Sequence, residues 1–242
     1  MPDNKKPIAY EAYCQLADDY DRLIETKPHN AYYDKPAVIS LWPELRDRRV
    51  LDAGCGPGSY TRKLLDRGAN VLAFDIVETM IEHAKRRVAD CENQNIEFHL
   101  LDMEQELPFD SESFDFVNAP LCLDYVQDWT RLFKEFCRVL RPGGMFVFSC
   151  GHPSFDAAYF KTTNYFSVEQ VSCEWTGFGN PVVVPSFRRS LEQSLMPVIN
   201  AGMVIDRVLE PLPTEEFKQA DLRRYKILMH RPGFLCVRAK RV

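Results

Sequence analysis

The stretch VLDAGCGPG at residues 50–58 decides the fold that we expect for this chain. The apolar run at 49–53 is typical of a buried strand, and residues 59–67 carry the pattern of a helix. The three glycines between them allow a sharp turn and a close backbone approach to a ligand. Such a turn can also do no more than let the helix pack closely on the strand. The stretch therefore predicts a strand–loop–helix unit, and a role in ligand binding needs support from a second feature.

The alternation of strand and helix continues along the chain. Further strands are predicted at 70–74, 96–101, 114–119 and 145–150, with helices at 78–89 and 129–140. Strands that alternate with helices indicate βαβ units, a parallel sheet, and a ligand crevice at the carboxyl ends of the strands. With two closing strands at 203–209 and 234–239, we expect an α/β fold with a doubly wound, mostly parallel, seven-stranded sheet.

Segments on either side of this core have other patterns. Residues 10–24 form an apolar stripe at helical spacing, and a short helix is expected between Pro36 and Pro43. Aromatic and β-branched residues around a turn signal at 176–180 predict an inserted hairpin. Ser190 and Gln193 resemble a capping box that opens a helix. One domain follows, divided into an N-terminal helical lid (1–45), the core (46–150), an inserted flap (151–190) and a closing segment (191–242).

Composition narrows the class of partner. The formal net charge is −5, from 35 acidic and 30 basic side chains. This balance disfavours a nucleic-acid partner, which requires clustered Lys and Arg, and favours a small-molecule substrate. No apolar run is long enough to span a membrane and no leader pattern is present, so a cytoplasmic protein is expected. The dispersed cysteines and histidines predict free thiols and no metal site.

A carboxylate at the end of the second strand adds to the loop. Asp75 follows Gly54 by about 20 residues, the spacing at which an acidic side chain can bind ribose hydroxyls, although an Asp there can also only cap a helix. A dinucleotide fingerprint would need Gly or Ala at position 59, where this chain has Ser59. The loop therefore disfavours a nicotinamide-dependent oxidoreductase.

Five features in order resemble the successive motifs of class I S-adenosylmethionine-dependent methyltransferases. The closest group is the small-molecule type that includes the ubiquinone/menaquinone C-methyltransferases, and the resemblance is strong over about residues 45–150. The features are VLDAGCGPG (50–58), Asp75, LDME with LPF (101–109), FDFV (114–117) and RPGG (141–144). The resemblance implies a Rossmann-like methyltransferase fold, S-adenosylmethionine as cofactor and residues 46–150 as its binding core.

The resemblance also implies roles in the glycine loop. Gly54 and Gly56, with Cys55 between them, would face the methionine part of the cofactor. Asp52 beneath them would organise the loop.

Roles for the nucleoside follow in the same way. Asp75 would bind the ribose hydroxyls, and Ile76 would lie against the adenine. Asp102 would accept a hydrogen bond from the adenine amino group, and the backbone N–H of Met103 would meet a ring nitrogen.

Residues near the sulfonium complete the implied site. The segment from Ala119 to Leu121 would form the floor. A tyrosine from the N-terminal segment would close over the methionine end, with Tyr20 and Tyr32 as the two candidates, although both can also be aromatics that pack helices.

Methyl transfer from a sulfonium is a displacement with a good leaving group, so alignment and exclusion of water are the main tasks of the protein. A base is needed only when the acceptor must lose a proton. His152, after the fifth strand, is the candidate base, or else part of a His-Pro turn. The aromatics of 155–187 suit an apolar or aromatic acceptor, or only the core of the hairpin. A non-catalytic module that binds the cofactor or a protein partner remains the alternative function, and the oligomeric state stays open.

Overall fold

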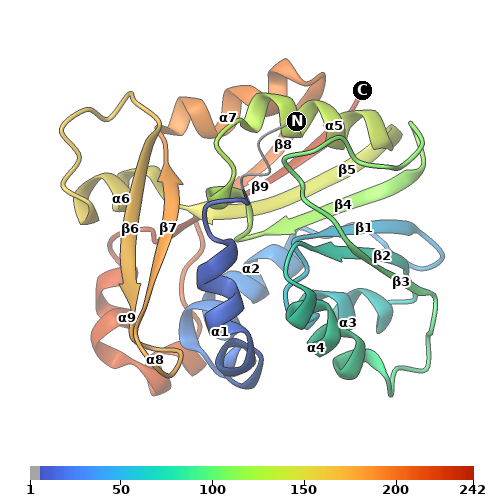
Figure 1. Cartoon of the computed structure of the whole chain (residues 1–242). Coiled ribbons are helices and arrows are strands. Elements are labelled where there is room, and N and C mark those ends of the chain that lie inside the picture. The colour runs from blue at the N-terminus through green and yellow to red at the C-terminus, as the bar shows by residue number, and fades with distance from the viewer. Residues whose placement is uncertain (1–5) are drawn as a thin grey trace.

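A seven-stranded sheet runs through the centre of the computed structural model, which describes residues 6–242 (Figure 1). The strand order is β3-β2-β1-β4-β5-β9-β8. The first five strands are parallel, whereas β9 is antiparallel to both of its neighbours. The strands are β1 (Arg49–Ala53), β2 (Asn70–Asp75), β3 (Ile96–Leu100), β4 (Phe114–Pro120), β5 (Leu140–Gly151), β8 (Met203–Leu209) and β9 (Phe234–Arg241). The prediction of a doubly wound, mostly parallel, seven-stranded sheet is confirmed.

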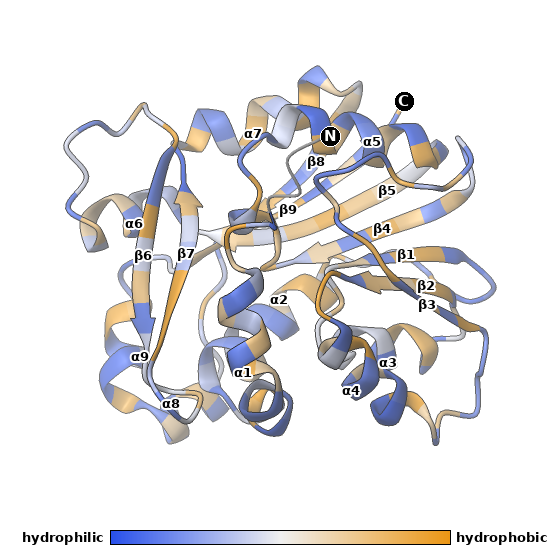
Figure 2. Cartoon of the chain, viewed as in Figure 1, coloured by the Kyte–Doolittle hydropathy of each residue, from blue (hydrophilic) through white to orange (hydrophobic). Residues whose placement is uncertain are grey.

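Helices cover both faces of the sheet, and each face has its own apolar core (Figure 1). Because side chains alternate along a strand, neighbouring residues of β1 serve different cores: Val50 belongs to one and Leu51 to the other. Figure 2 shows apolar residues along the central strands and hydrophilic residues on α4. One face carries α2 (Lys35–Ser40), α3 (Ser59–Leu65) and α4 (Glu78–Val88), and the other carries α5 (Trp129–Val139) and α7 (Leu191–Asn200).

The sequence of α5 explains how it packs. Its buried residues recur at helical spacing and form one apolar stripe against β5. Asp128 caps the first turn, where its carboxylate accepts a hydrogen bond from the N–H of Arg131 at 3.1 Å. The Phe133 ring packs against Phe146 and Phe148 of β5, with centroids 5.2 and 5.4 Å apart. This aromatic packing fixes α5 on the sheet.

Segments distant in the chain meet over the carboxyl ends of the parallel strands. Figure 1 places α1 beside the inserted hairpin there, and α1 contacts both β7 and α4. The predicted hairpin is confirmed as a separate two-stranded antiparallel sheet. The elements at this end are α1 (Tyr10–Leu23), the π-helix η1 (Asn30–Asp34), the 3-10 helix η2 (Leu123–Tyr125), β6 (Glu169–Trp175) and β7 (Val182–Arg188).

The rest of the chain contains short helices that the sequence pattern left out. These are α6 (Pro153–Tyr159) and α9 (Leu222–Leu228), whereas α8 (Glu215–Ala220) begins directly after its capping residue Thr214. The capping box of Ser190 and Gln193 is present at the start of α7. The motif RPGG at 141–144 lies inside β5, next to an irregularity in the pairing of β4 with β5, because Leu140 already pairs with Phe114.

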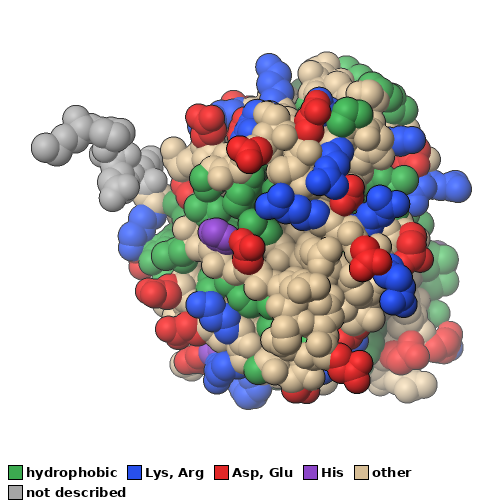
Figure 3. All heavy atoms as spheres, turned by 90° about the vertical axis from the view of Figure 1, so that its right-hand side faces the viewer, with side chains coloured by type: hydrophobic (Ala, Val, Ile, Leu, Met, Phe, Trp, Pro, Cys, Tyr) green, Lys and Arg blue, Asp and Glu red, His purple; other side chains and the backbone are tan. Residues whose placement is uncertain are grey.

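Surface features complete the description of residues 6–242. Within this range no helix combines the length and the apolarity needed to cross a membrane. Acidic and basic side chains are interspersed over the face drawn in Figure 3. Residues 1–5 lie outside the described part of the chain. They include the start of the expected lid and part of the terminal segment in which no leader pattern was expected.

Candidate functional site

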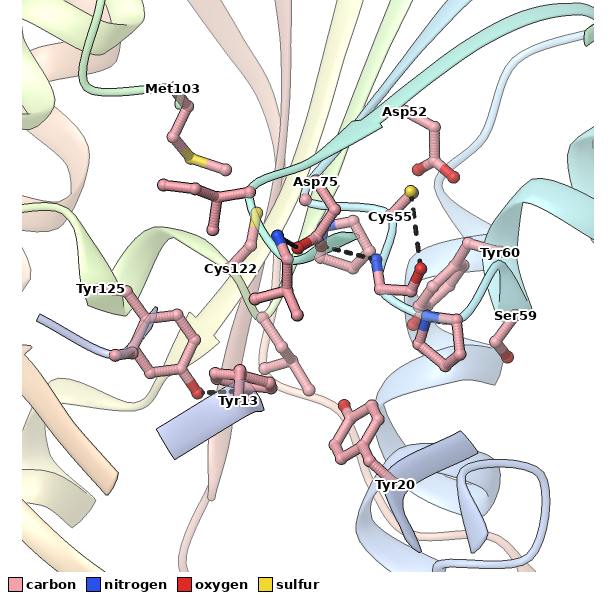
Figure 4. Close-up of a pocket in the computed structure, with 18 of the residues that line it drawn as sticks. Tyr13, Tyr20, Asp52, Cys55, Ser59, Tyr60, Asp75, Met103, Cys122 and Tyr125 are labelled. Atoms are coloured by element: carbon pink, nitrogen blue, oxygen red, sulfur yellow. Dashed lines mark hydrogen bonds between the residues drawn. The ribbon is translucent and has the colours of Figure 1, made fainter. Parts of the chain in front are cut away.

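A cavity lies at the carboxyl ends of β1, β2 and β4, beneath α1 and η2 (Figure 4). It holds about 1060 Å³ of space, part of which is open to solvent. The glycine loop, residues 101–104 and side chains of α1 contribute to its walls. The cavity therefore brings strand ends, loop backbone and aromatic side chains to one place, where open α/β sheets bind their ligands.

The glycine loop packs so tightly that two positions exclude a side chain. Gly54 has a φ of +63°, and a Cβ there would lie 2.6 Å from the Cβ of Cys122. Gly58 has a φ of +80°, and a Cβ there would lie 2.9 Å from the Cα of Ala84 in α4. Glycine tolerates both the positive φ and the close approach. The loop thus lies directly against η2 on one side and α4 on the other.

Asp52 holds the loop from beneath. Its carboxylate accepts hydrogen bonds from the Thr61 hydroxyl at 2.6 Å and from the Asn118 amide at 2.8 Å. The Trp42 indole donates in turn to the Asn118 carbonyl oxygen at 3.0 Å. Burial raises the pKa of Asp52 to about 6, against the effect of these hydrogen bonds. The network ties β1 to α3 and β4, which fixes the strand ends that carry the cavity.

Asp75 closes the other side of the loop. One carboxylate oxygen accepts from the N–H of Gly56 at 2.9 Å, and the other accepts from the N–H of Val77 at 3.0 Å. Burial raises its pKa, while the backbone donors oppose that shift. A carboxylate has about four lone-pair positions, so two remain to accept from a ligand. Figure 4 shows this side chain at the centre of the cavity wall.

Residues after β3 form the far end of the cavity. Asp102 turns the chain there, because its carboxylate accepts from the N–H of Glu104 at 2.8 Å. Figure 4 places Met103 on this side, beyond Asp75. Ile76 and Leu101 also line the cavity. This end combines an apolar slot with a carboxylate, an arrangement that can accept a base with an exocyclic amine.

An aromatic wall faces the glycine loop. The hydroxyls of Tyr13 and Tyr125 lie 2.7 Å apart, and Tyr13 also packs edge-on against Trp175 of the hairpin. Tyr20 stacks on Phe178 with centroids 4.8 Å apart. Burial raises the pKa of Tyr13, Tyr20 and Tyr125 well above the usual range, so all three stay neutral phenols. The wall is largely apolar, and its polar points include the Tyr13–Tyr125 hydroxyl pair and the Tyr20 hydroxyl, which accepts from the Asn30 amide at 3.4 Å.

Most of the residues singled out from the sequence come together in this cavity. The side chain or backbone of ten lines it: Tyr20, Asp52, Gly54, Cys55, Gly56, Asp75, Ile76, Asp102, Met103 and Leu121. Ala119 lies in the apolar core under α5 instead. Tyr32 packs against the cluster of Tyr33, Phe217 and Leu228, away from the cavity.

His152 also lies outside the cavity lining. Its Nε2 is 2.8 Å from a carboxylate oxygen of Glu210, and its Nδ1 accepts from the N–H of Ser154 at 3.2 Å. Both ring nitrogens are engaged, and the residue caps α6. The arrangement accounts for the His-Pro turn, and the candidate role of His152 as a base stays a prediction.

Some cavity residues had no signal in the sequence. Asp34 and Tyr60 line the cavity, and the Tyr60 hydroxyl donates to the Asp34 carboxylate at 2.5 Å. In the sequence, Asp34 follows a Pro-His-Asn stretch that indicates only a break between helices. Within residues 6–242, no group of three or more His, Cys, Asp or Glu side chains is arranged to hold a metal ion.

Comparisons with known proteins agree with this geometry. Residues 51–148 match the model of a family described as a methyltransferase domain. A malonyl-[acyl-carrier protein] O-methyltransferase of Salmonella typhimurium is 32% identical over 60% of this chain and 54% of its own length. A demethylmenaquinone methyltransferase of Lactococcus lactis is also 32% identical, over 60% of this chain and 59% of its own length. The chain thus spans a little over half the length of these two relatives.

A solved structure is similar over a longer range. An S-adenosylmethionine-dependent methyltransferase from Mesorhizobium loti is 27% identical, with a TM-score of 0.69, over 90% of this chain and 100% of its own. The matched family model covers the glycine loop, Asp75 and residues 101–104. The fold, the loop and these matches lead to one conclusion: residues 51–148 form a methyltransferase domain of the S-adenosylmethionine-dependent type.

Proposed function

We propose that this protein transfers the methyl group of S-adenosylmethionine to a small acceptor of apolar or aromatic character. One observation carries the proposal: the cavity has a polar wall of loop and carboxylates opposite an aromatic wall of Tyr13, Tyr20 and Tyr125, behind which the hairpin packs. The polar wall fits a nucleoside with an amino acid part. The aromatic wall fits an apolar molecule beside it.

The polar wall meets the requirements of the cofactor. Asp75 keeps two lone-pair positions for ribose hydroxyls while its backbone bonds hold it in place. Gly54 approaches Cys122 and Met103 so closely that its Cβ would fill the space between them, which leaves the loop backbone bare toward the cavity. Ile76 and Asp102 offer an apolar contact and an acceptor to the adenine. When bound, S-adenosylmethionine supplies an activated methyl group on a sulfonium.

The chain's own residues would act by positioning. Tyr20, stacked on Phe178, would cover the loop end of the cavity, and the hairpin would keep water from the aromatic wall. The Tyr13–Tyr125 hydroxyl pair would orient an oxygen or nitrogen of the acceptor. Because both phenols stay neutral, they would act as hydrogen-bonding groups and not as bases. Alignment of two bound molecules can supply about 7–11 kcal/mol of the barrier.

The division of the chain supports the same assignment of tasks. We assign acceptor choice to the lid (1–45) and the flap (151–190), because Tyr13 lines the cavity and Trp175 and Phe178 of the flap pack behind the wall to which it belongs. The names of the two relatives indicate different acceptors, a quinone precursor and an acyl-carrier protein conjugate, so they do not select one here.

The eight cysteines are free thiols, which is expected of a cytoplasmic protein.

Calorimetric titration tests the cofactor first. The folded protein should bind S-adenosylhomocysteine with micromolar affinity and should not bind NAD. Binding of neither ligand would favour the non-catalytic alternative. Since one fold can host several reactions, transfer of labelled methyl groups to a panel of quinols, phenols and short acyl conjugates then identifies the acceptor.

A pair of variants tests the aromatic wall. Trp175→Ala should reduce methyl transfer at least tenfold and leave the affinity for S-adenosylhomocysteine within twofold. Val183→Ala, at an exposed position of the same hairpin, is the matched control and should change neither quantity. Equal activity of the two variants would contradict an acceptor site at this wall.

A further inference from the structure

Asp34 has an unpartnered oxygen in the wall of the cavity. The residue is 1% exposed, and one carboxylate oxygen accepts from the Tyr60 hydroxyl at 2.5 Å. The other oxygen, Oδ1, is fully buried and has no hydrogen-bond partner. Leaving such an atom unpaired in the folded protein costs free energy, more for a charged group than for a neutral one. A hydrogen-bond donor on a ligand in the cavity would relieve this cost.

The other carboxylates of the cavity are already engaged. Asp52 accepts from Thr61 on one carboxylate oxygen and from Asn118 on the other. Asp75 and Asp102 each accept from backbone N–H groups. Among the carboxylate oxygens that line the cavity within residues 6–242, Asp34 Oδ1 is the one that is fully buried without a partner.

The position of Asp34 selects one part of the cofactor. Tyr60, which holds Asp34, belongs to the first turn of α3, directly after the glycine loop. Figure 4 shows Tyr60 and Met103 on opposite sides of Asp75. With the adenine beside Met103 and the ribose at Asp75, the amino acid part reaches the Tyr60 side.

The backbone around Asp34 is also unusual. Asp34 is the last residue of the π-helix η1, and Lys35 starts α2 directly behind it. Single π-turns in otherwise α-helical segments are frequent at functional sites. The Lys35 ammonium is occupied by Glu25 at 2.6 Å, so it leaves Asp34 Oδ1 free.

We propose that Asp34 binds the α-ammonium group of the amino acid part of S-adenosylmethionine. Oδ1 accepts a charge-assisted hydrogen bond from the ammonium, and the Tyr60 hydroxyl holds the carboxylate in the required orientation. The inference rests on the proposed function, since it assumes that the cavity holds this cofactor. It gives the N-terminal segment a direct part in cofactor binding.

Two ligands that differ only at this end test the proposal. S-adenosylhomocysteine carries the amino acid part, and 5′-methylthioadenosine keeps the adenine, ribose and sulfur without it. The Asp34→Asn variant should bind S-adenosylhomocysteine at least tenfold more weakly than the unchanged protein. Its affinity for 5′-methylthioadenosine should stay within twofold. Asp102→Asn is the matched control and should weaken both ligands by the same factor.

The outcomes separate this inference from the function on which it rests. Equal weakening of both ligands by Asp34→Asn, or no weakening of either, overturns the role of Asp34 while the cofactor assignment stands. Failure of the folded, unchanged protein to bind either ligand overturns both. Should Asp34→Asn fail to fold, the unchanged protein is titrated at pH 6 in two buffers of different ionisation enthalpy. Proton release with S-adenosylhomocysteine but not with 5′-methylthioadenosine supports the proposal, and equal release overturns it.

Discussion

The hydroxyl of Tyr13 lies 2.7 Å from the hydroxyl of Tyr125, although 112 positions separate the two residues in the chain. Tyr13 belongs to α1 and Tyr125 to η2, so this hydrogen bond joins the N-terminal segment to the loop after β4. The pair is part-buried, and it lies where the aromatic wall faces the cavity. The pair therefore joins two segments of the fold and also lies in the wall where we propose that the acceptor binds.

Removing one hydroxyl of this pair should cost more than removing both. Tyr125→Phe leaves the Tyr13 hydroxyl without a partner, and we expect a loss of about 1–2 kcal/mol in the free energy of unfolding. The double variant with Tyr13→Phe should recover part of this loss, because no buried donor remains. A double-mutant cycle by urea denaturation measures the coupling. Additive losses would show that the two hydroxyls are energetically independent.

Asp75→Asn should weaken binding of S-adenosylhomocysteine at least tenfold. An amide has only one acceptor oxygen, so it cannot hold the N–H groups of Gly56 and Val77 and also serve both ribose hydroxyls. Glu82→Gln, on the exposed surface of α4, is the matched control and should bind normally. Calorimetric titration decides, and unchanged affinity in folded Asp75→Asn would remove Asp75 from the site.

Asp34→Asn should stabilise the folded protein at neutral pH. Burial raises the pKa of Asp34 from its usual 3.8 to about 6, so the folded state binds more protons than the unfolded state between these values. The stability that protonated Asp34 contributes is complete below about pH 4 and is lost as the pH rises through 6. Burial raises the pKa of Asp34 against the opposing effects of the Ser149 hydroxyl, the Tyr60 hydroxyl and the charge of Lys35.

The Asp34→Asn variant has no carboxyl group to ionise at this position, so it does not lose stability in this way as the pH rises. The unfolding free energy of Asp34→Asn should therefore exceed that of the unchanged protein by about 1–3 kcal/mol at pH 7 and match it near pH 4. Asp52 also has a pKa raised to about 6, but it is present in both proteins and cancels in the difference. Urea denaturation at a series of pH values checks the difference. A difference in unfolding free energy between the two proteins that does not vary with pH would contradict the raised pKa of Asp34.

Two glycines of the loop should respond differently to alanine. Both have a positive φ, which costs a residue with a Cβ about 1–2 kcal/mol. A Cβ at Gly54 would also meet Cys122 at 2.6 Å, whereas a Cβ at Gly56 would meet nothing within 4 Å. We expect Gly54→Ala to lose more stability than Gly56→Ala by about 1–3 kcal/mol. Thermal denaturation compares the two, and equal losses would place the loop farther from η2.

The core of the fold could be predicted because its signals are local. Strand β1 was expected at 49–53 and is observed at Arg49–Ala53, since apolar residues bounded by a glycine turn leave little choice of period. Helix α6 was missed, because seven residues give too short a window for a helical period. The π-helix η1 was missed as well, since it depends on backbone hydrogen bonds that no side-chain pattern marks.

The residues of the site fall into the same two groups: some have a local signal in the sequence, and others are placed by contacts between distant parts of the chain. The glycine loop and Asp75 carry spacing that a sequence reveals. The burial of Asp34 arises from Tyr60, 26 positions away, and no pattern around Asp34 contains that contact. The choice between Tyr20 and Tyr32 likewise depended on which residue α1 and η1 turn toward the cavity. Long-range packing decides such placements.

The position of β9 has a consequence for how the protein forms during synthesis. Strand β8 joins the sheet only through β9, which pairs with β5 on its other edge. Since β9 leaves the ribosome after β8, the nascent chain must hold β5 as an unpaired edge until the last strand emerges. Exposed strand edges invite pairing with other chains. Between the synthesis of β5 and that of β9, the nascent chain therefore carries a strand edge that can pair with other chains.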